Sequence, residues 1–444
     1  MDKARETALK IMNLVHQQEA YANVALAQEL KKGGLSDIDR RFVTELVYGS
    51  VKAGDTLDWI IRQYVTRTLK KIDPVVLNIL RLGTYQIRYM DKVPESAACN
   101  ESVELAKRHA NEGAAKFVNG VLRSMAREPE KAVFPSGKGK ATAELALKEQ
   151  HPEWLVRRWI KEYGFDGARS LCQFNNGQAV LSVRTNTVKT NRSELMLELL
   201  SRGIDSRQSL WAPEGVLIDS HSSLDSLSAL QDGLCQVQDE SSMLVAHVVD
   251  PQPGDLILDL CSAPGGKTTH MAAMMHNRGR VIAMDIYDHK LARVNENAER
   301  LGLHNIETRN MDAREAWQAF PQRADRVLVD APCSGLGVLR RKPDSRWRKT
   351  PELLKELPKL QLEILRSGAG AVRPGGILVY STCTIAREEN QAVVEEFLSA
   401  AKEFELLHAG ERLPMYRDEE MVQLLPHVDG TDGFFIACMR RKEK

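Results

Sequence analysis

Two cysteines and an aspartate stand in short polar loops late in the chain, where their types and spacing could support covalent chemistry. Asp330 and Cys333 belong to the loop sequence DAPCSG, and Cys383 lies in the sequence STCT. Each loop directly follows an apolar stretch with the pattern of a buried strand. The spacing therefore predicts two thiols and a carboxylate that face one pocket, rather than isolated structural cysteines.

This set of groups suits methylation of a ring carbon that is a poor nucleophile, such as carbon 5 of cytosine. Addition of a thiolate at carbon 6 converts the ring into an enamine, which can attack an electrophilic methyl group. An acid near ring nitrogen 3 must stabilise charge during the addition, and Asp330 could serve if its pKa is raised. The other thiol could then assist release of the product. The residues alone leave open which of Cys333 and Cys383 attacks.

A third loop predicts a nucleoside site. An apolar run, Leu256–Leu260, meets the small-residue turn Ser262–Gly266, and a helix begins near Lys267. Strand, glycine-rich turn and helix start form a ligand cradle. A P-loop would need glycine where Cys261 stands, and the turn also lacks the GxGxxG pattern of dinucleotide sites. The loop therefore predicts a ligand without phosphates.

Acidic residues follow successive predicted strands and point to a cationic ligand. Asp259, Asp285, Asp312 and Asp330 stand at or just past strand ends. In an open α/β sheet, ligands bind at the edge formed by the carboxyl ends of the parallel strands. A carboxylate after the second strand suits a ribose diol, and one after the third suits an adenine amino group. With no basic phosphate clamp, the pattern favours S-adenosylmethionine.

The elements that position these loops predict an α/β domain over residues 236–444. Strands alternate regularly with helices, which is typical of a doubly wound parallel sheet. Two late pieces, Glu403–Leu407 and Gly433–Met439, could add an antiparallel edge. The predicted parallel strands are Leu256–Leu260, Val281–Asp285, Ile306–Arg309, Arg326–Asp330 and Gly376–Ser381.

The first half of the chain predicts two further parts, which makes the protein multidomain. Residues 1–130 show helical periodicity throughout, with a capping box at Ser36 and an acidic cap before Pro74, and predict a separate all-α bundle. Residues 131–148 read as a linker. Residues 149–235 combine strand-like and helical stretches, which predicts a small α+β module ahead of the catalytic domain.

Composition limits the class of protein. The 444-residue chain has a formal net charge of +1, so bulk charge gives no argument for nucleic acid. No apolar run approaches the roughly twenty residues of a membrane span, and the charged amino terminus has no signal-peptide pattern, which predicts a cytoplasmic protein. Seven cysteines without a CxxC pair predict reduced thiols and no metal site. We expect a monomer.

From Val180 to Met439 the chain resembles the RNA 5-methylcytosine methyltransferases. The matching motifs are RTNT, VQDESS, SAPGGKT, DAPCSG, STCT and DGFF. The resemblance implies a Rossmann-like S-adenosylmethionine-dependent methyltransferase domain, with Cys383 as the nucleophile and Cys333 assisting product release. The cofactor contacts that it implies are Cys261, Ser262, Ala263, Pro264, Gly265, Gly266, Lys267, Asp285, Asp312 and Asp330.

The amino-terminal bundle resembles NusB-like RNA-binding domains through Asp39–Val51, Leu80–Met90 and Lys116–Arg123. Such a bundle fused to this catalytic domain is similar to bacterial enzymes that methylate cytosine in 16S ribosomal RNA, in a single-stranded or opened region. The basic stretch from Arg340 to Lys349 could then bind RNA phosphates, with Trp347 either stacking on a base or packing. Two alternatives stay open: methylation of tRNA, and a non-catalytic RNA-binding regulator.

Overall fold

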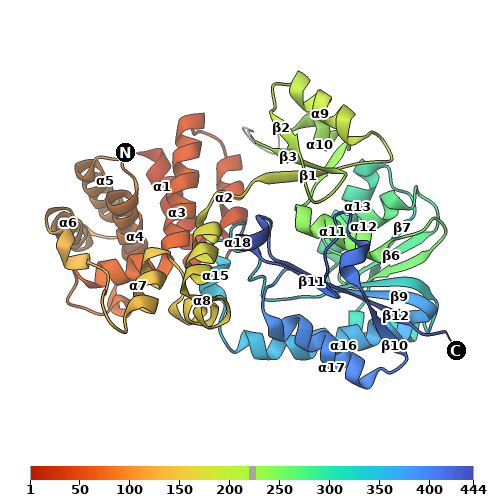
Figure 1. The fold of residues 1–444 in the computed structure, drawn as a ribbon. Coiled ribbons are helices and arrows are strands. Elements are labelled where there is room, and N and C mark those ends of the chain that lie inside the picture. The colour runs from red at the N-terminus through yellow and green to blue at the C-terminus, as the bar shows by residue number, and fades with distance from the viewer. Residues whose placement is uncertain (1, 220–226, 444) are drawn as a thin grey trace. The chain divides into compact units, whose positions relative to one another are not determined.

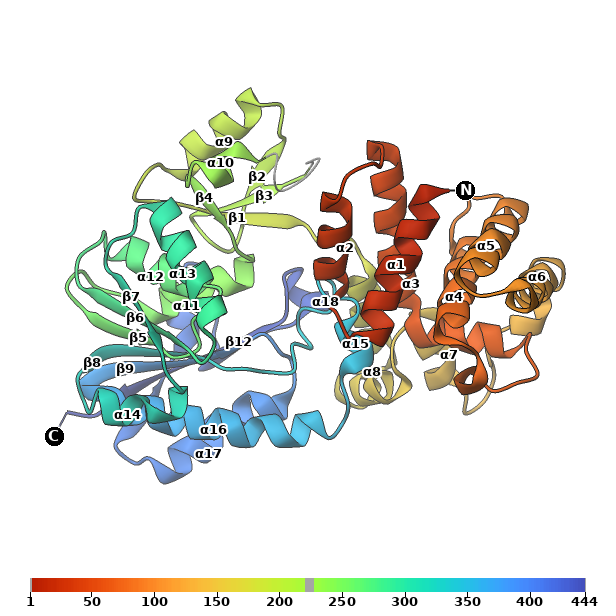
Figure 2. The same ribbon diagram turned by 180° about the vertical axis from the view of Figure 1, so that it is seen from behind.

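The computed structural model describes residues 2–219 and 227–443, and these divide into two compact units. The first unit comprises Met1–Gly177 with the inserted segment Leu339–Lys349, and the second comprises Gln178–Val338 with Thr350–Lys444. Within the described ranges, no helix has the length and apolar character that a membrane span needs. The ribbon views show an all-helical first unit and a second unit that contains the sheets (Figures 1 and 2).

The first unit contains the helical bundle predicted over residues 1–130 and also α8, from the stretch predicted as part of the small α+β module. Ser36 and Asp73 cap α3 and α4 with side-chain oxygens, as the sequence predicts. Apolar stripes from α1 to α6 meet in one core that includes Ile11, Leu46 and Leu80. The elements are α1 (Lys3–Gln17), α2 (Ala22–Lys31), α3 (Asp37–Arg62), η1 (Leu69–Lys71), α4 (Pro74–Tyr89), α5 (Glu95–His109), α6 (Glu112–Arg127), η2 (Pro129–Ala132), α7 (Ala141–Lys148), α8 (Glu153–Asn176) and α15 (Ser345–Arg348). Helix α7 thus lies in the stretch predicted as a linker.

The basic segment that follows the DAPCSG loop does not present all of its charges to solvent. Arg346 is fully buried and donates hydrogen bonds to the Gln150 carbonyl (2.9 Å), the Asn175 carbonyl (3.1 Å) and Asn176 Oδ1 (2.8 Å). Trp347 donates from Nε1 to the Lys52 carbonyl at 3.1 Å and packs on the backbone of α3 at Gly54. The phosphate-binding interpretation is therefore wrong for Arg346, and Trp347 has the packing role.

Replacing Arg346 with alanine is expected to lower the free energy of unfolding of the first unit by roughly 2–4 kcal/mol, because three buried oxygens lose a charged donor. Thermal unfolding of the full chain measures this change. Lys342→Ala, at an exposed position in the same segment, is the matched control. Unchanged stability together with weaker RNA binding would instead indicate a phosphate contact.

The small α+β module opens the second unit. Its antiparallel sheet has the strand order β2-β3-β1-β4, and its core contains Val183, Leu195 and Val216. The elements are β1 (Leu181–Thr185), α9 (Arg192–Ser201), β2 (Ser206–Gln208), β3 (Gly215–Ile218), α10 (Ser228–Gln231) and β4 (Cys235–Val237).

The α/β domain follows and confirms the predicted doubly wound architecture. Its sheet runs β10-β12-β9-β8-β5-β6-β7, in which the five strands from β9 to β7 are parallel. β10, β11 and β12 pair antiparallel at one edge, as the two late apolar pieces predict. The strands are β5 (Leu256–Asp259), β6 (Arg280–Asp285), β7 (Ile306–Asn310), β8 (Ala324–Asp330), β9 (Val372–Thr382), β10 (Phe404–Leu407), β11 (Met421–Leu424) and β12 (Phe434–Arg441).

Helices cover both faces of this sheet (Figure 2). Neighbouring residues of β5 separate the two cores: Ile257 packs with α11, α12 and α13, whereas Leu258 packs with α14, α16 and α17. This alternation follows from the two-residue repeat of a strand. The remaining elements are α11 (Glu240–Val249), α12 (Gly266–Met274), α13 (Asp288–Leu301), η4 (Ala313–Glu315), α14 (Ala316–Ala319), α16 (Leu353–Ala371), η5 (Arg387–Glu389), α17 (Gln391–Ala400), η6 (Ala409–Arg412) and α18 (Pro426–Asp429).

Candidate active site

The two cysteine loops meet at the carboxyl edge of the parallel sheet. β8 and β9 are adjacent, with Asp330 opposite Ser381, and each strand leads directly into one of the loops. The Cys333 and Cys383 Sγ atoms are consequently 3.3 Å apart. The hydrogen bond with Cys383, together with burial, raises the pKa of Cys333 well above its usual range. The two thiols therefore share one hydrogen bond at this edge of the sheet.

Asp330 is held between a lysine and a serine. Lys267 Nζ donates to Asp330 Oδ2 at 2.7 Å, and Ser381 Oγ donates to Oδ1 at 3.0 Å. Burial alone would lower the pKa of Lys267, but its ion pair and hydrogen bond with Asp330 outweigh burial and raise that pKa. The ammonium also lies 4.8 Å from the centre of the Phe434 ring. The ion pair thus joins the loop Cys261–Lys267 to the aspartate of the DAPCSG loop.

The turn before α12, which the sequence predicts as a ligand cradle, is held by hydrogen bonds to β6 and α13. Gly265 has φ of +98°, a conformation that side chains disfavour, and it leads into the first turn of α12. Ser262 donates from N and Oγ to the Met284 carbonyl at 2.8 and 3.0 Å. Asn297 Nδ2 donates to the Pro264 carbonyl at 3.0 Å. These bonds fix the turn against β6 and α13.

Arg184 of the RTNT motif anchors the same turn from the small module. Its side chain is buried and donates from Nη1 to the Gly266 carbonyl (2.6 Å) and from Nη2 to Thr269 Oγ1 (3.0 Å). These hydrogen bonds tie β1 to the first turn of α12.

Carboxylates lie close to the loop Cys261–Lys267, as the strand ends predict. Burial raises the pKa of the Cys261 thiol, and the charges of Asp259, Asp330, Asp285 and Asp312 raise it further. Asp285 Oδ1 accepts from the Tyr287 backbone N–H at 3.0 Å. These four carboxyl groups therefore lie near the Cys261 thiol at this edge of the sheet.

Asp312 is paired with a neighbouring arginine of its own segment. Its oxygens accept from Arg314, with the shortest contact at 2.6 Å, and this bond lowers the pKa of Asp312. It also caps η4 by accepting from the Arg314 backbone N–H. A ligand amino group at this position would have to share the carboxylate with Arg314.

Asp259 is a buried carboxyl whose charge the fold disfavours. Burial raises its pKa to about 7, even though Oδ2 accepts a hydrogen bond from Thr268 Oγ1 at 2.7 Å. The folded chain therefore holds a proton that the unfolded chain, with an aspartate pKa of about 3.9, has released. Stability should fall as the pH rises from about 4 to about 7, and the change should end above that range.

Substituting asparagine for Asp259 is expected to remove this dependence. The free energy of unfolding of Asp259→Asn should rise relative to that of the parent chain across this range, by no more than about 4 kcal/mol. Denaturant unfolding of both proteins at a series of pH values checks the result. If the free energy of unfolding depends on pH in the same way for both proteins, the pKa of Asp259 is not raised.

Glu389 is a site residue that the sequence reasoning missed. It is fully buried, and its carboxylate accepts from the Ser334 N–H (2.8 Å), the Ser334 hydroxyl and Gln361 Nε2 (3.0 Å). Thr384 Oγ1 contacts the same carboxylate at 3.4 Å. One carboxylate thus binds the residues that follow both cysteines. Its position within a charged stretch of sequence resembles that of a surface helix start, so no local pattern identifies it.

Glu389→Ala is expected to lower kcat by roughly 10²-fold, because the two thiols would lose their fixed separation. The binding constant for S-adenosylmethionine, the ligand that the sequence predicts, should stay the same, since Glu389 acts as a positioning residue through Ser334. Steady-state kinetics and calorimetry separate the two effects. Glu388→Ala, at the exposed neighbouring position, is the control. A change in cofactor binding with kcat intact would contradict the positioning role.

Two glycines allow the DGFF motif, Asp432–Phe435, to lie against the cysteine loops. Gly337 donates to the Cys383 carbonyl (3.1 Å), and the Gly433 N–H donates to the Gly337 carbonyl (2.9 Å). A Cβ atom on Gly337 would lie 2.1 Å from the Gly433 carbonyl oxygen. Glycine is therefore required at position 337, where the chain passes against the DGFF motif.

Comparisons with known proteins agree with this arrangement. A family model described as 16S rRNA methyltransferase RsmB/F matches residues 246–440, the NusB family model matches residues 2–127, and an RsmF/B-like ferredoxin-like domain matches residues 151–225. The probable ribosomal RNA small subunit methyltransferase B of Bacillus subtilis (strain 168) is 41% identical over 447 residues. This match covers 99% of the present chain and 98% of that relative.

Solved structures show the same fold. The crystal structure of PH0851 covers 99% of both chains, with a TM-score of 0.85 and 28% identity. NSun6 from Pyrococcus horikoshii, solved with SFG, has a TM-score of 0.60 and 24% identity, and the match covers 66% of the present chain and 99% of that one. The likeness to NSun6 concerns the fold alone.

Proposed function

The chain belongs to the 16S rRNA methyltransferase RsmB/F family, and from this premise we propose that it methylates carbon 5 of a cytosine in 16S ribosomal RNA. The observation that carries the proposal is the 3.3 Å contact between the Cys333 and Cys383 thiols beside Asp330. Methylation of an exocyclic amine needs no such thiol, whereas methylation at carbon 5 needs a nucleophile that adds to carbon 6.

S-adenosylmethionine is the cofactor of this family, and the residues at the sheet edge fit it. Carboxylates surround Cys261, which favours a cationic ligand. The bound cofactor supplies an electrophilic methyl group. We expect the loop Cys261–Lys267 and the carboxylates of Asp285, Asp312 and Asp330 to hold it.

In the proposed reaction, Cys383 attacks carbon 6 of the cytosine. The Lys267–Asp330 pair lies on the same edge. The Lys267 ammonium, which donates to the Asp330 carboxylate at 2.7 Å, carries the proton that the pair can pass to nitrogen 3. After methyl transfer, a base removes the carbon 5 proton and the bond between carbon 6 and Cys383 breaks. Cys333 lies next to that sulfur and assists this release.

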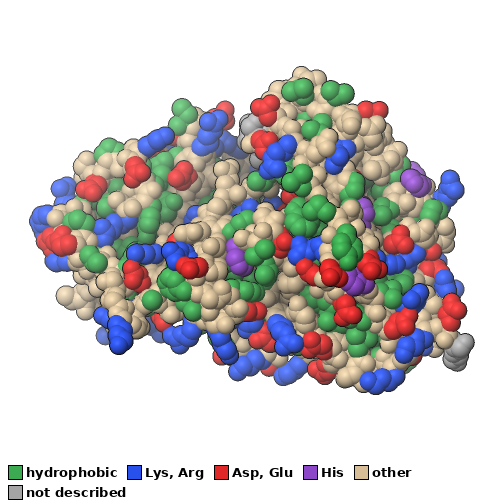
Figure 3. Space-filling model, in the orientation of Figure 1, with side chains coloured by type: hydrophobic (Ala, Val, Ile, Leu, Met, Phe, Trp, Pro, Cys, Tyr) green, Lys and Arg blue, Asp and Glu red, His purple; other side chains and the backbone are tan. Residues whose placement is uncertain are grey.

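The substrate base must leave its stack to meet Cys383, so the target lies in a single-stranded or opened region of RNA. The NusB-like bundle supplies a second RNA-binding part. Lys and Arg side chains are interspersed with Asp and Glu on the face in view, so no patch of one sign identifies the RNA path there (Figure 3).

Mapping of 5-methylcytosine in total RNA from cells with and without this protein tests the function. Loss of one modified position in 16S ribosomal RNA, restored by the wild-type chain, is the expected result. Loss confined to tRNA would overturn the choice of substrate. An unchanged map, together with no binding of labelled S-adenosylmethionine, would indicate a non-catalytic regulator.

A further inference from the structure

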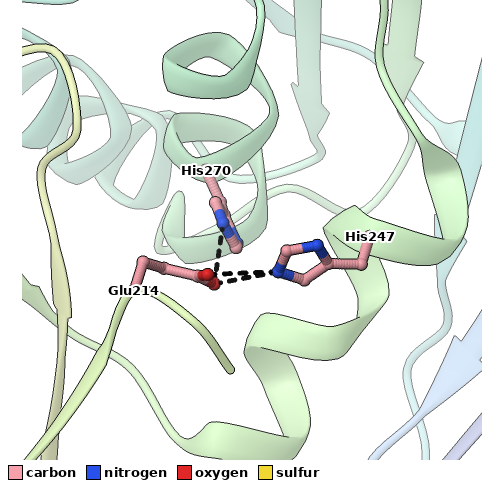
Figure 4. Close-up of side chains that lie close together, drawn as sticks. All are labelled: Glu214, His247 and His270. Carbon is pink, nitrogen blue, oxygen red and sulfur yellow. Dashed lines mark hydrogen bonds and ion pairs between the residues drawn. The ribbon is translucent and has the colours of Figure 1, made fainter. Parts of the chain in front are cut away.

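Away from the cysteine loops, a carboxylate and two imidazoles converge inside the second unit (Figure 4). Glu214 directly precedes β3, His247 lies on α11 and His270 lies on α12. His270 Nε2 is 3.1 Å from Glu214 Oε1, and His247 Nε2 is 3.1 Å from Glu214 Oε2. Among the residues that the structure describes, this is the one group of three or more potential metal-binding side chains with such spacing.

The three side chains are arranged around a common point. Their donor atoms all lie within 4.8 Å of one another. The two imidazole rings meet edge to face at an angle of 85°, which directs both Nε2 atoms at the same carboxylate. Zinc bonds of about 2.0–2.1 Å in tetrahedral geometry place ligand atoms roughly 3.3 Å apart, so the observed contacts of 3.1 Å need little adjustment.

Burial and ligand type narrow the choice of ion. The exposed fractions of the Glu214 and His270 side chains are 8% and 4%, and that of His247 is 18%. Two imidazoles and one carboxylate suit zinc and similar transition-metal ions, whereas calcium and magnesium prefer oxygen ligands. Buried surroundings leave little room for several waters, which favours four-coordinate zinc over a six-coordinate ion.

We propose that Glu214, His247 and His270 form a zinc site in this protein. The sequence predicted no metal site because its cysteines lack metal-binding spacing, but this group uses no cysteine and assembles only in the fold. The ion would link the small module, through Glu214, to α11 and α12. Because α12 also carries Lys267 in its first turn, the site would stabilise the helix that follows the loop Cys261–Lys267.

The metal content of the full-length chain, produced without a histidine tag in zinc-supplemented medium, tests the proposal. After desalting, we expect about one zinc per chain, and X-ray absorption should show nitrogen or oxygen neighbours at about 2.0–2.1 Å. Sulfur neighbours at about 2.3 Å would place the zinc on the thiol pair and overturn the assignment. Less than roughly a tenth of an equivalent, with no uptake of added zinc, would also overturn it.

Variants assign the ion to these residues. His247→Ala and His270→Ala should each reduce bound zinc at least about tenfold. The double variant Cys333→Ser/Cys383→Ser and the exposed-site control His304→Ala should retain the metal. Where an alanine variant fails to fold, Glu214→Gln provides the same test, because it keeps the shape of the side chain and removes its charge. Zinc that persists in all triad variants would refute the site.

Discussion

Cys383→Ala is expected to lower the rate of RNA methylation by at least about 10³-fold, because the variant has no group that can add to carbon 6 of the base. Without that addition, carbon 5 remains too poor a nucleophile to accept a methyl group. Transfer of labelled methyl groups from S-adenosylmethionine to 16S ribosomal RNA, under single-turnover conditions, measures the loss.

Two controls keep this test specific. The affinity for S-adenosylmethionine should be unchanged in Cys383→Ala, since the cofactor loop and its carboxylates are intact. Cys99→Ala removes a buried thiol from the helical unit and should retain activity. A near wild-type rate for Cys383→Ala would show that the nucleophile has been assigned to the wrong residue.

The architecture of the catalytic domain could be predicted because its strands and turns carry strong local signals. The run Leu256–Leu260 and the turn before Lys267 identify a strand and a ligand loop without knowledge of the rest of the chain. Caps at Ser36 and Asp73 likewise locate helix starts from neighbouring residues alone. These features depend on short-range hydrogen bonds and on the periodicity of apolar residues.

The pairing of the two cysteine loops depends on strand order, which local patterns do not encode. β8 and β9 lie side by side, with Asp330 opposite Ser381, and this register brings Cys333 to Cys383. A sheet with another strand order could have placed the two loops apart. The sequence could therefore predict that both thiols face the ligand edge, but not that they touch.

Buried polar residues were the least predictable part of the chain. Arg346 and Glu389 lie in charged stretches that resemble solvent-exposed segments, yet both are fully buried and hydrogen-bonded. Their burial follows from contacts with residues distant in sequence, such as Asn176 for Arg346. The triad of Glu214, His247 and His270 escaped prediction for the same reason, since each residue alone is unremarkable in its element.

Cys333→Ala is expected to trap the enzyme on its RNA. Once the methyl group is on carbon 5, a proton must leave that carbon while the electrons of the bond between carbon 6 and sulfur return to Cys383. Cys333 lies 3.3 Å from that sulfur and is placed to assist this elimination. Without it, addition and methyl transfer should proceed, but the covalent protein–RNA adduct should accumulate by at least about tenfold over wild type.

Denaturing gels of the enzyme incubated with labelled 16S ribosomal RNA and S-adenosylmethionine would detect the adduct as a slowly migrating band. The double variant Cys333→Ala/Cys383→Ala should form no such band, because no sulfur remains to attack the base. This contrast separates the two roles: one cysteine makes the bond that the other helps to break. A Cys333→Ala enzyme that turns over without any adduct would remove Cys333 from the release step and leave the 3.3 Å contact with a purely structural role.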